Sequence, residues 1–385
     1  MEALEVLDII SKGEDSKHQF KENFSNANSL ASEMVAFSNS EGGMIVIGIS
    51  DDKEIIGLST EDINRLNNLI SNTATNNVKN PINVKTEINS IENKNILLLF
   101  VEKGIDKPYM DNNSIIWVKN GADKRKVTSR EEMRRMFQSS DLISSDKMPI
   151  EGTSINDIDK DLISEFYLKE NEENISELDI PLINYLQNSN LAKDGKINLA
   201  GLLMFGENPQ LYKPEFIIKA VSFVGNEDTS DKYRDSEDIK GNLQKQYQDS
   251  LSFVTRNLHK IQKDKNFNSV GDIEIPEVVF IEIIVNSLIH RDYFISSPIR
   301  IFIFDDRIEI ISPGSLPNSL TIENIKTGNS LARNPILISF GTKILPYRGI
   351  GTGVKRAIKY YKNIEFINDI DNNQFKVIIL RPKTE

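Results

Sequence analysis

The 385-residue sequence contains no cysteine and only three histidines, His18, His259 and His290. The lack of cysteine excludes disulfides and thiolate metal sites, and so few histidines make a histidine-built zinc site unexpected. No apolar run reaches the roughly 18 residues that a membrane-spanning helix needs. The first five residues, MEALE, lack the basic start and apolar stretch of a secretory signal. We therefore expect a cytoplasmic protein with no membrane contact.

Positive charge is scarce overall, with a net charge of −11, but it is unevenly distributed. Residues 119–135 hold seven basic and three acidic residues, whereas residues 136–190 hold three basic and twelve acidic residues. This change of sign, in a chain long enough for two domains, indicates a domain boundary. We predict a first domain at 1–140, an acidic linker at 141–156 and a second domain at 157–385.

The apolar patterns predict both helices and strands in each domain, which is an α+β fold. In the first domain we predict a helix and a strand within 1–24, helices at 28–40, at 60–73 and from about 129, and strands at 44–49, 82–89, 95–102 and 114–118. In the second we predict a helical stretch at 157–190, helices at 199–205, 238–264, 276–290 and after 353, and strands at 216–224, 299–304, 307–312 and 375–380.

Two features of the second half carry chemistry. Glu282 and Asn286 stand four residues apart in an apolar helix, so both project from one face. The carboxylate could position a water and the amide oxygen could hold Mg²⁺. Gly349-Ile350-Gly351-Thr352-Gly353 leads into a helix, where exposed backbone N–H groups can cradle phosphate. Taken singly, the pair also fits a helix surface, and the glycines fit an ordinary turn.

These features follow one another in an order that resembles the GHKL ATPases, and more closely the RecG-like ATP-binding proteins attached to Schlafen-type domains. The resemblance covers roughly 150–385 and is carried, besides the glycines, by HRDY at 290–293, RIEIISPG at 307–314 and RNP at 333–335. It implies an α/β sandwich that binds ATP and Mg²⁺. Glu282 would be the general base, Asn286 the Mg²⁺ ligand, and Gly314, Gly349, Gly351 and Gly353 would contact the nucleotide.

One position departs from that family. GHKL proteins read adenine with an aspartate just before the first glycine motif, where this chain has Ser312. A serine can form a hydrogen bond but is not a charged acceptor. We therefore expect nucleotide binding more readily than ATP hydrolysis.

The first third resembles the AlbA-like domain of Schlafen proteins over about residues 5–135. The matching strings are GEDSKHQFK at 13–21, AFSNSEGGMIVIGISDD at 36–52 and WVKNGA at 117–122. The resemblance implies binding of DNA or RNA. Some Schlafen domains also cut RNA with metal-holding carboxylates, which would fall here at Glu14, at position 19, and at Asp51 and Asp52. Position 19 is the neutral Gln19, so we predict binding rather than cutting.

Several basic side chains could contact nucleic-acid phosphates. Lys17 and Lys21 share the strand face of Gln19, and the candidates further along the chain are Arg125, Lys126 and Arg130. The alternative for the lysines is that they are ordinary solvated charges. For Asn39, Gly42 and Gly43 the structural alternative is a helix cap and a tight turn before a buried strand, and we favour it for the two glycines.

Three functions remain open from the sequence. The first is a nucleic-acid-binding regulator whose second domain senses or uses a nucleotide, in transcription or in defence against phage. The second is a metal-dependent nuclease gated by ATP, with Glu14 and Asp51 catalytic and Glu14, Asp51 and Asp52 holding the metal. The third is a scaffold with both sites vestigial. The expected partners are DNA or RNA and a nucleotide, self-association is left open, and a terminal winged helix is not expected.

Overall fold

A computed structural model describes residues 1–140, 142–229, 232–261, 272–317 and 320–382. The chain divides into two units, Met1–Ile143 and Ser144–Glu385. The division falls inside the segment that the charge pattern marks as a linker. Beyond it, Ser145 and Asp146 are already buried, and Asp146 Oδ2 accepts the N–H of Ile336 at 2.6 Å. No described helix is long and apolar enough to cross a membrane.

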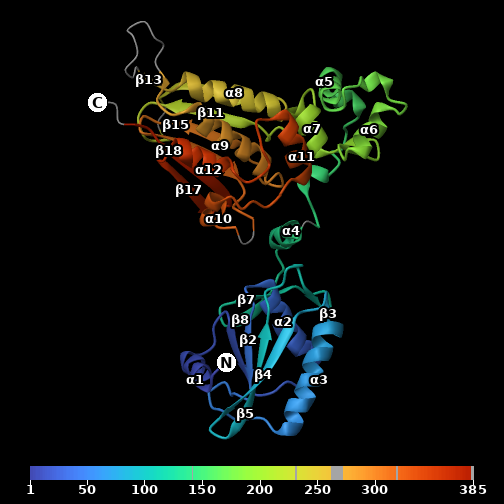
Figure 1. The fold of residues 1–385 in the computed structure, drawn as a ribbon, viewed down its shortest axis with the longest axis vertical. Helices are drawn as coiled ribbons and strands as arrows, with labels where there is room; N and C mark the ends of the chain where they lie inside the picture. The colour runs from blue at the N-terminus through green and yellow to red at the C-terminus, as the bar shows by residue number, and fades with distance from the viewer. Residues whose placement is uncertain (141, 230–231, 262–271, 318–319, 383–385) are drawn as a thin grey trace. The chain divides into compact units, whose positions relative to one another are not determined.

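The first unit is built on a four-stranded sheet of order β1-β2-β5-β4, in which β1 and β2 are parallel and the other pairs are antiparallel. The hairpin β7-β8 and the short pair β3-β6 lie outside this sheet. Its elements, coloured blue to teal in Figure 1, are α1 (Ala3–Lys12), β1 (His18–Lys21), α2 (Ala27–Asn39), β2 (Gly43–Ile47), α3 (Thr60–Asn76), β3 (Val78–Lys79), β4 (Val84–Ile91), β5 (Lys94–Val101), β6 (Met110–Asp111), β7 (Trp117–Asn120), β8 (Asp123–Lys126) and α4 (Arg130–Ser139).

The uniformly apolar sequence of β2 follows from burial on both of its faces. Met44 and Val46 pack with α1, whereas Ile45 and Ile47 pack with α2 and α3. Successive strand residues point to opposite faces, so neither set of side chains reaches solvent. The neighbouring strand β1 is thereby held in parallel register, with Gln19 opposite Ile45.

The second unit contains a six-stranded mixed sheet of order β12-β11-β15-β16-β18-β17. Helices α8, α9 and α12 cover one face of it (Figure 1). The strands of this sheet and these helices are β11 (Ile218–Phe223), β12 (Tyr233–Ile239), α8 (Leu243–Arg256), α9 (Glu277–His290), β15 (Ile299–Ile303), β16 (Arg307–Pro313), α12 (Gly353–Tyr360), β17 (Ile364–Asp369) and β18 (Gln374–Leu380). The short strands β13 (Lys260–Ile261) and β14 (Asp272–Ile273) form a separate antiparallel pair.

A helical group precedes the sheet in sequence and includes one helix from near the end of the chain. Its elements and the remaining short helices are η1 (Ser145–Lys147), η2 (Ile155–Asp157), α5 (Lys160–Asn171), η3 (Ile175–Glu177), α6 (Leu182–Asn188), β9 (Ala192–Lys193), β10 (Lys196–Ile197), α7 (Leu199–Phe205), η4 (Pro209–Leu211), α10 (Ile322–Thr327) and α11 (Pro335–Ile344). The α+β class predicted from the sequence is confirmed, and the second unit has the expected helix-on-sheet arrangement.

Helix α9 occupies the centre of this unit. Eight of its residues are buried, because α8, α12 and the sheet all contact it. In the strand behind it, Ile299, Ile301 and Ile303 face the core while Arg300 alternates to the other side. The polar residues of α9 are therefore placed in an apolar setting.

The predicted helix 238–264 was wrong at its start. Residues Tyr233–Ile239 form the edge strand β12, paired with β11, and the helix α8 begins only at Leu243. Asn242 caps that helix by accepting the N–H of Lys245 at 2.9 Å. Residues 262–264 of the predicted helix lie outside the described residues, and those at 260–261 form β13.

Candidate nucleotide pocket and candidate nucleic-acid surface

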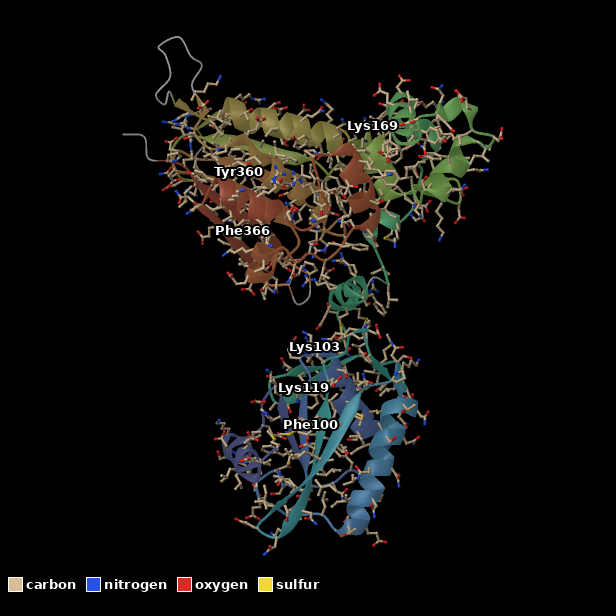
Figure 2. The ribbon with its side chains drawn as sticks, in the orientation of Figure 1. Phe100, Lys103, Lys119, Lys169, Tyr360 and Phe366 are labelled. Atoms are coloured by element: carbon tan, nitrogen blue, oxygen red, sulfur yellow. The ribbon has the colours of Figure 1, made fainter. Side chains whose placement is uncertain are left out.

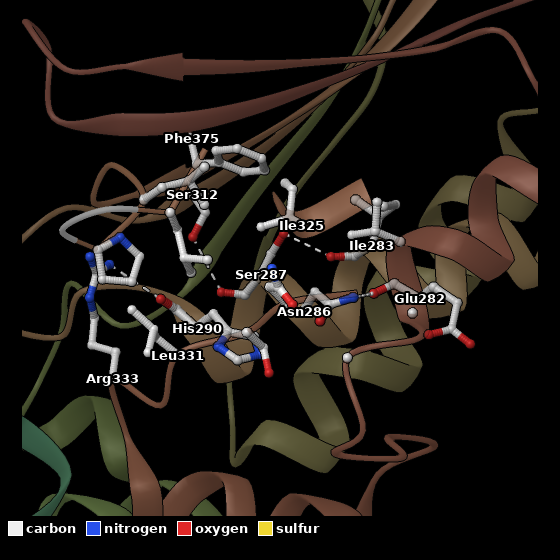
Figure 3. Close-up of a pocket in the computed structure, with 18 of the residues that line it drawn as sticks. Glu282, Ile283, Asn286, Ser287, His290, Ser312, Ile325, Leu331, Arg333 and Phe375 are labelled. Atoms are coloured by element: carbon white, nitrogen blue, oxygen red, sulfur yellow. Dashed lines mark hydrogen bonds between the residues drawn. The ribbon is translucent and has the colours of Figure 1, made fainter. Parts of the chain in front are cut away.

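A pocket of about 1020 Å³, counted with the open space at its mouth, lies in the second unit (Figure 3). It is lined by α9, the end of β16 and the loop after it, the loop before α11, and the glycine segment 349–353. Side chains of β17 and β18, among them Phe366 and Phe375, add apolar surface. The two predicted features of this half, the polar pair and the glycine segment, therefore line one cavity.

Glu282 and Asn286 both line this pocket from α9 (Figure 3). Glu282 is 5% exposed, and its Oε1 accepts a hydrogen bond of 2.5 Å from Nη1 of Arg356 on α12. Burial raises the pKa of Glu282, although the nearby guanidinium of Arg356 opposes this. Asn286 donates from Nδ2 to the carbonyl of Glu282 at 2.7 Å, and within the described residues its Oδ1 has no hydrogen-bond partner. Asn286 Oδ1 is thus available to a ligand, whereas the Oε1 atom of the Glu282 carboxylate is paired with Arg356.

The glycine segment is shaped by close backbone approaches. Gly351 has φ +70°, and a Cβ there would lie 2.1 Å from the carbonyl oxygen of Gly328. Gly353 begins α12, and a Cβ on it would lie 2.7 Å from Oε2 of Glu282 and 2.8 Å from Nδ2 of Asn286. Glycine at position 353 therefore lets the start of α12 pack directly on the polar pair.

Polar groups of the same segment remain without partners. The hydroxyl of Thr352 is buried and has no hydrogen-bond partner in the part of the chain that the structure describes. The first N–H groups of α12 lack acceptors within the helix, as at any helix start. These groups are the kind of donors that bind phosphate.

Ser312 lies on β16 where the resemblance places the base-reading residue. It lines the pocket, is 6% exposed and donates from Oγ to the carbonyl of Ser287 at 3.3 Å (Figure 3). Gly314 also lines the pocket and has φ +102°, and a Cβ there would lie 2.5 Å from Nη1 of Arg333. Both positions are therefore within the cavity.

His290 and Tyr347 both line the pocket. A hydrogen bond of 2.8 Å joins Nε2 of His290 to the hydroxyl of Tyr347. Burial lowers the pKa of His290 to about 4, and the guanidinium of Arg333 adds to this. Burial also raises the pKa of Tyr347 to about 12. The histidine is therefore neutral at pH 7 and acts here as a hydrogen-bonding side chain.

The residues present fit a nucleotide better than they fit a tightly held metal. Free N–H groups, the unpartnered Thr352 hydroxyl and an apolar wall suit a phosphate-bearing ligand. For Mg²⁺ the pocket offers Asn286 Oδ1, and a cation there would depend on the ligand's phosphates for further oxygens. Among the described residues, no group of three or more His, Cys, Asp or Glu side chains could hold a metal ion.

In the first unit, the predicted acidic positions are not brought together as a metal site. Glu14 Oε1 accepts hydrogen bonds from Nε2 of Gln19 at 2.6 Å and from the N–H of Phe20 at 2.7 Å. Asp51 and Asp52 lie in an exposed turn.

Gln19 is contacted by the ammonium of Lys119 as well as by Glu14. Lys119 donates from Nζ to Oε1 of Gln19 at 2.7 Å and lies 4.8 Å from the centre of the Phe37 ring. Burial lowers the pKa of Lys119, although the carboxylates of Glu33 and Glu14 oppose this. A positive charge thus stands beside the side chain that the resemblance expects to be a metal-binding carboxylate.

The predicted phosphate-contacting residues differ in their availability. Lys17, Lys126 and Arg130 are exposed, and Lys21 is half-buried. Arg125 instead forms two hydrogen bonds, of 3.0 and 2.7 Å, with the carboxylate of Glu132. Its charge is therefore already neutralised within the unit.

Sequence reasoning missed basic side chains that gather around the end of α2. Lys107 donates to the carbonyl of Ser40 at 2.6 Å, Lys103 pairs with Glu41 at 2.9 Å, and Lys119 donates its backbone N–H to Ser40 Oγ at 2.9 Å. Figure 2 labels Lys103 and Lys119 toward the same end of the sheet. Burial lowers the pKa of Lys107 to about 8, and the charge of Lys103 adds to this. No local signal in the sequence links these residues, because they meet only through the fold.

The tight turn predicted at Gly42 and Gly43 agrees with their contacts, whereas Asn39 is the last residue of α2 and its side chain bonds distant backbone instead of capping the helix. Asn39 is buried and bonds both the N–H and the carbonyl of Tyr109, as well as the carbonyl of Trp117. Gly42 has φ +73°, and a Cβ there would lie 2.8 Å from the N of Lys103. These residues fix the chain at the end of α2.

Three family models match parts of the chain. "Schlafen, AlbA_2" matches residues 14–128, "Putative ATP-dependent DNA helicase recG C-terminal" matches residues 296–379, and a domain of unknown function (DUF8451) matches residues 134–218. The second model begins after α9, so it covers the glycine segment but not Glu282 and Asn286. No curated protein matches the chain.

Solved structures similar to this chain include one from Corynebacterium diphtheriae and one from Nitrosomonas europaea. The DIP2311 protein from Corynebacterium diphtheriae is 19% identical with a TM-score of 0.47, and the match covers 99% of this chain and 80% of that one. The N-terminal domain of a RecG-related protein from Nitrosomonas europaea is 17% identical with a TM-score of 0.26, over 34% of this chain and 96% of that one. From the family matches, the chain carries a Schlafen AlbA_2 domain followed by a RecG-type, HATPase-like C-terminal domain.

Proposed function

We propose that the second unit binds ATP in the pocket between α9 and the glycine segment, and that the first unit binds DNA or RNA. The observation that carries the nucleotide proposal is the packing of Gly353, at the start of α12, against both Glu282 and Asn286. This packing places the start of α12, with its free N–H donors, beside Oε2 of Glu282 and Nδ2 of Asn286. The HATPase-type match over 296–379 supports the same ligand.

Each pocket group has a defined task in this proposal. The N–H groups at the start of α12 and the Thr352 hydroxyl would bind phosphate oxygens. Asn286 Oδ1 would contribute one ligand to Mg²⁺, which neutralises phosphate charge when bound. Ser312 would face the base, as a neutral hydrogen-bonding group.

A structure with an ATP analogue and Mg²⁺ tests this assignment. The expected result is ligand density that bridges Asn286 and residues 349–353. Density for the analogue elsewhere in the unit, with this pocket empty at saturating ligand, would contradict the proposal.

Substitution of exposed basic residues tests the proposed nucleic-acid surface. Fluorescence anisotropy with single- and double-stranded oligonucleotides should show binding that weakens as salt rises. Arg130→Ala should reduce the salt slope by about one, as expected for a lost phosphate contact. Arg125→Ala is the matched control and should change the salt slope less, because Glu132 already pairs with the Arg125 guanidinium. Equal effects of the two variants, or no binding at low salt, would count against this surface.

The metal-dependent nuclease gains no support from the first unit. Glu14 is engaged by Gln19 and Phe20, and the ammonium of Lys119 lies beside Gln19. We propose instead that the unit retains nucleic acid without cutting it, as a regulator of transcription or a component of phage defence would. Metal-dependent cleavage that is lost in Asp51→Ala would reverse this choice.

A further inference from the structure

The ion pair between Glu282 and Arg356 joins α9 to the helix that follows the glycine segment. The Glu282 side chain is 6% exposed and that of Arg356 is 31% exposed. Arg356 stands three residues after Gly353, so it lies on the same side of α12 as the residue that touches the polar pair. The guanidinium is thus held against the carboxylate of Glu282, a residue that lines the pocket, and its charge is paired there.

This pair differs from the fully buried ion pair of the same unit. Arg381 and Glu274 have side chains that are 2% and 1% exposed, and Arg381 makes two hydrogen bonds to Glu274 and a third to the carbonyl of Phe304. Arg356 is bound by one hydrogen bond and keeps part of its surface in contact with solvent. Its guanidinium has donors left over for another acceptor.

A phosphate group is the acceptor that fits these donors. Guanidinium binds phosphate through two parallel hydrogen bonds and carries its positive charge at every relevant pH. The Thr352 hydroxyl and the first N–H groups of α12 are on the same turn, and within the described residues that hydroxyl lacks a partner. A polyphosphate placed there would compete with Glu282 for Arg356.

We propose that Arg356 makes the pocket selective for phosphorylated ligands, and that Glu282 holds it until a phosphate group replaces the carboxylate. This selectivity rests on the proposed nucleotide-binding function. Arg356 would be the residue that distinguishes a nucleoside triphosphate from a nucleoside. Release of Arg356 by the ligand also frees the Glu282 carboxylate within the pocket. Glu282 and Arg356 thus exchange partners when the ligand binds.

Calorimetry on the full chain tests this with ATP plus MgCl₂ and, separately, with adenosine. The proteins are wild type, Glu282→Gln, Arg356→Gln and the double variant. Arg356→Gln should weaken ATP about tenfold, the size of a lost charge-assisted contact, and leave adenosine unchanged. Glu282→Gln should strengthen ATP severalfold when Arg356 is present and give no gain in the Arg356→Gln background.

The double-variant cycle separates the exchange from simple repulsion between Glu282 and phosphate. An equal gain from Glu282→Gln in both backgrounds would mean repulsion and would overturn the proposal, as would an equal loss of ATP and adenosine affinity in Arg356→Gln. If neither ligand binds any variant or the wild type, it is the nucleotide-binding function that fails.

Thermal unfolding checks that each variant is folded. Should Arg356→Gln unfold, Arg356→Lys replaces it, because lysine keeps the charge but loses the paired hydrogen bonds, and a severalfold loss of ATP affinity alone is expected.

Discussion

His290 illustrates how one side chain couples the pocket wall to pH. His290 forms a hydrogen bond with Tyr347. Burial lowers the pKa of His290 from the ordinary value of 6.5 to about 4. Between these two values the unfolded chain binds the proton and the folded chain does not. The contribution to stability is therefore complete above pH 6.5 and is lost as pH falls toward 4.

We predict that His290→Gln has a weaker pH dependence of stability than the wild type between pH 6.5 and 4.5. The free energy of unfolding of the wild type should fall by an extra amount on the order of 2 kcal/mol over this range. Urea unfolding at several pH values measures it. Parallel curves for the two proteins would show that His290 does not titrate as the structure indicates.

At single residues, the sequence singled out side chains that line one pocket, and their binding of a nucleotide stays a prediction. Glu282, Asn286 and the glycines could be singled out because a helical spacing and a glycine motif are local patterns. The Arg356 pairing was missed, although its spacing of three from Gly353 placed it on the correct side of α12. The contact between Lys119 and Gln19 joins residues 100 positions apart, and no local pattern encodes it.

At the scale of elements, one carboxylate tethers a distant helix. Asp146 is fully buried, and its Oδ2 accepts the N–H groups of Ile336 and Leu337 at 2.6 and 3.1 Å, at the start of α11. A carboxylate at that end of a helix satisfies free donors and the helix dipole. The helix α11 in turn holds the loop that contributes Arg333 to the pocket.

We predict that Asp146→Ala lowers the free energy of unfolding of the second unit by about 2 kcal/mol, since two buried donors lose their acceptor. Asp228→Ala, at an exposed position, is the control and should change it by less than about 0.5 kcal/mol. Thermal or urea unfolding measures both. An Asp146→Ala protein as stable as the control would contradict the capping role.

The fold was most predictable where apolar periodicity was strong. Helix α9 and strand β2 were predicted close to their observed bounds because their side chains are buried. The strand β12 was missed because YRDSEDI is polar, as an edge strand can be when one face meets solvent. The pairing that makes it a strand is provided by β11, a partner that its own sequence does not reveal.

At the scale of the whole molecule, the chain contains two units with separate cores. The buried clusters of the first unit involve residues up to Val127, with Met133 and Met136 packed against one of them. We predict that residues 1–143 fold alone and unfold cooperatively in urea. The fragment should bind oligonucleotides with the same salt dependence as the full chain. A fragment without a cooperative transition would show that its stability depends on the second unit.

Calorimetry with ATP and MgCl₂ on wild type and Asn286→Ala measures whether the second unit binds ATP in this pocket. The matched control is Asn171→Ala, because Asn171 makes the same bond to its own helix, from Nδ2 to the carbonyl of Tyr167 at 3.0 Å, away from the pocket. We expect wild type and Asn171→Ala to bind ATP alike and Asn286→Ala to bind it at least about tenfold more weakly. No binding to the wild type, or equal affinities for all three proteins, would contradict this expectation.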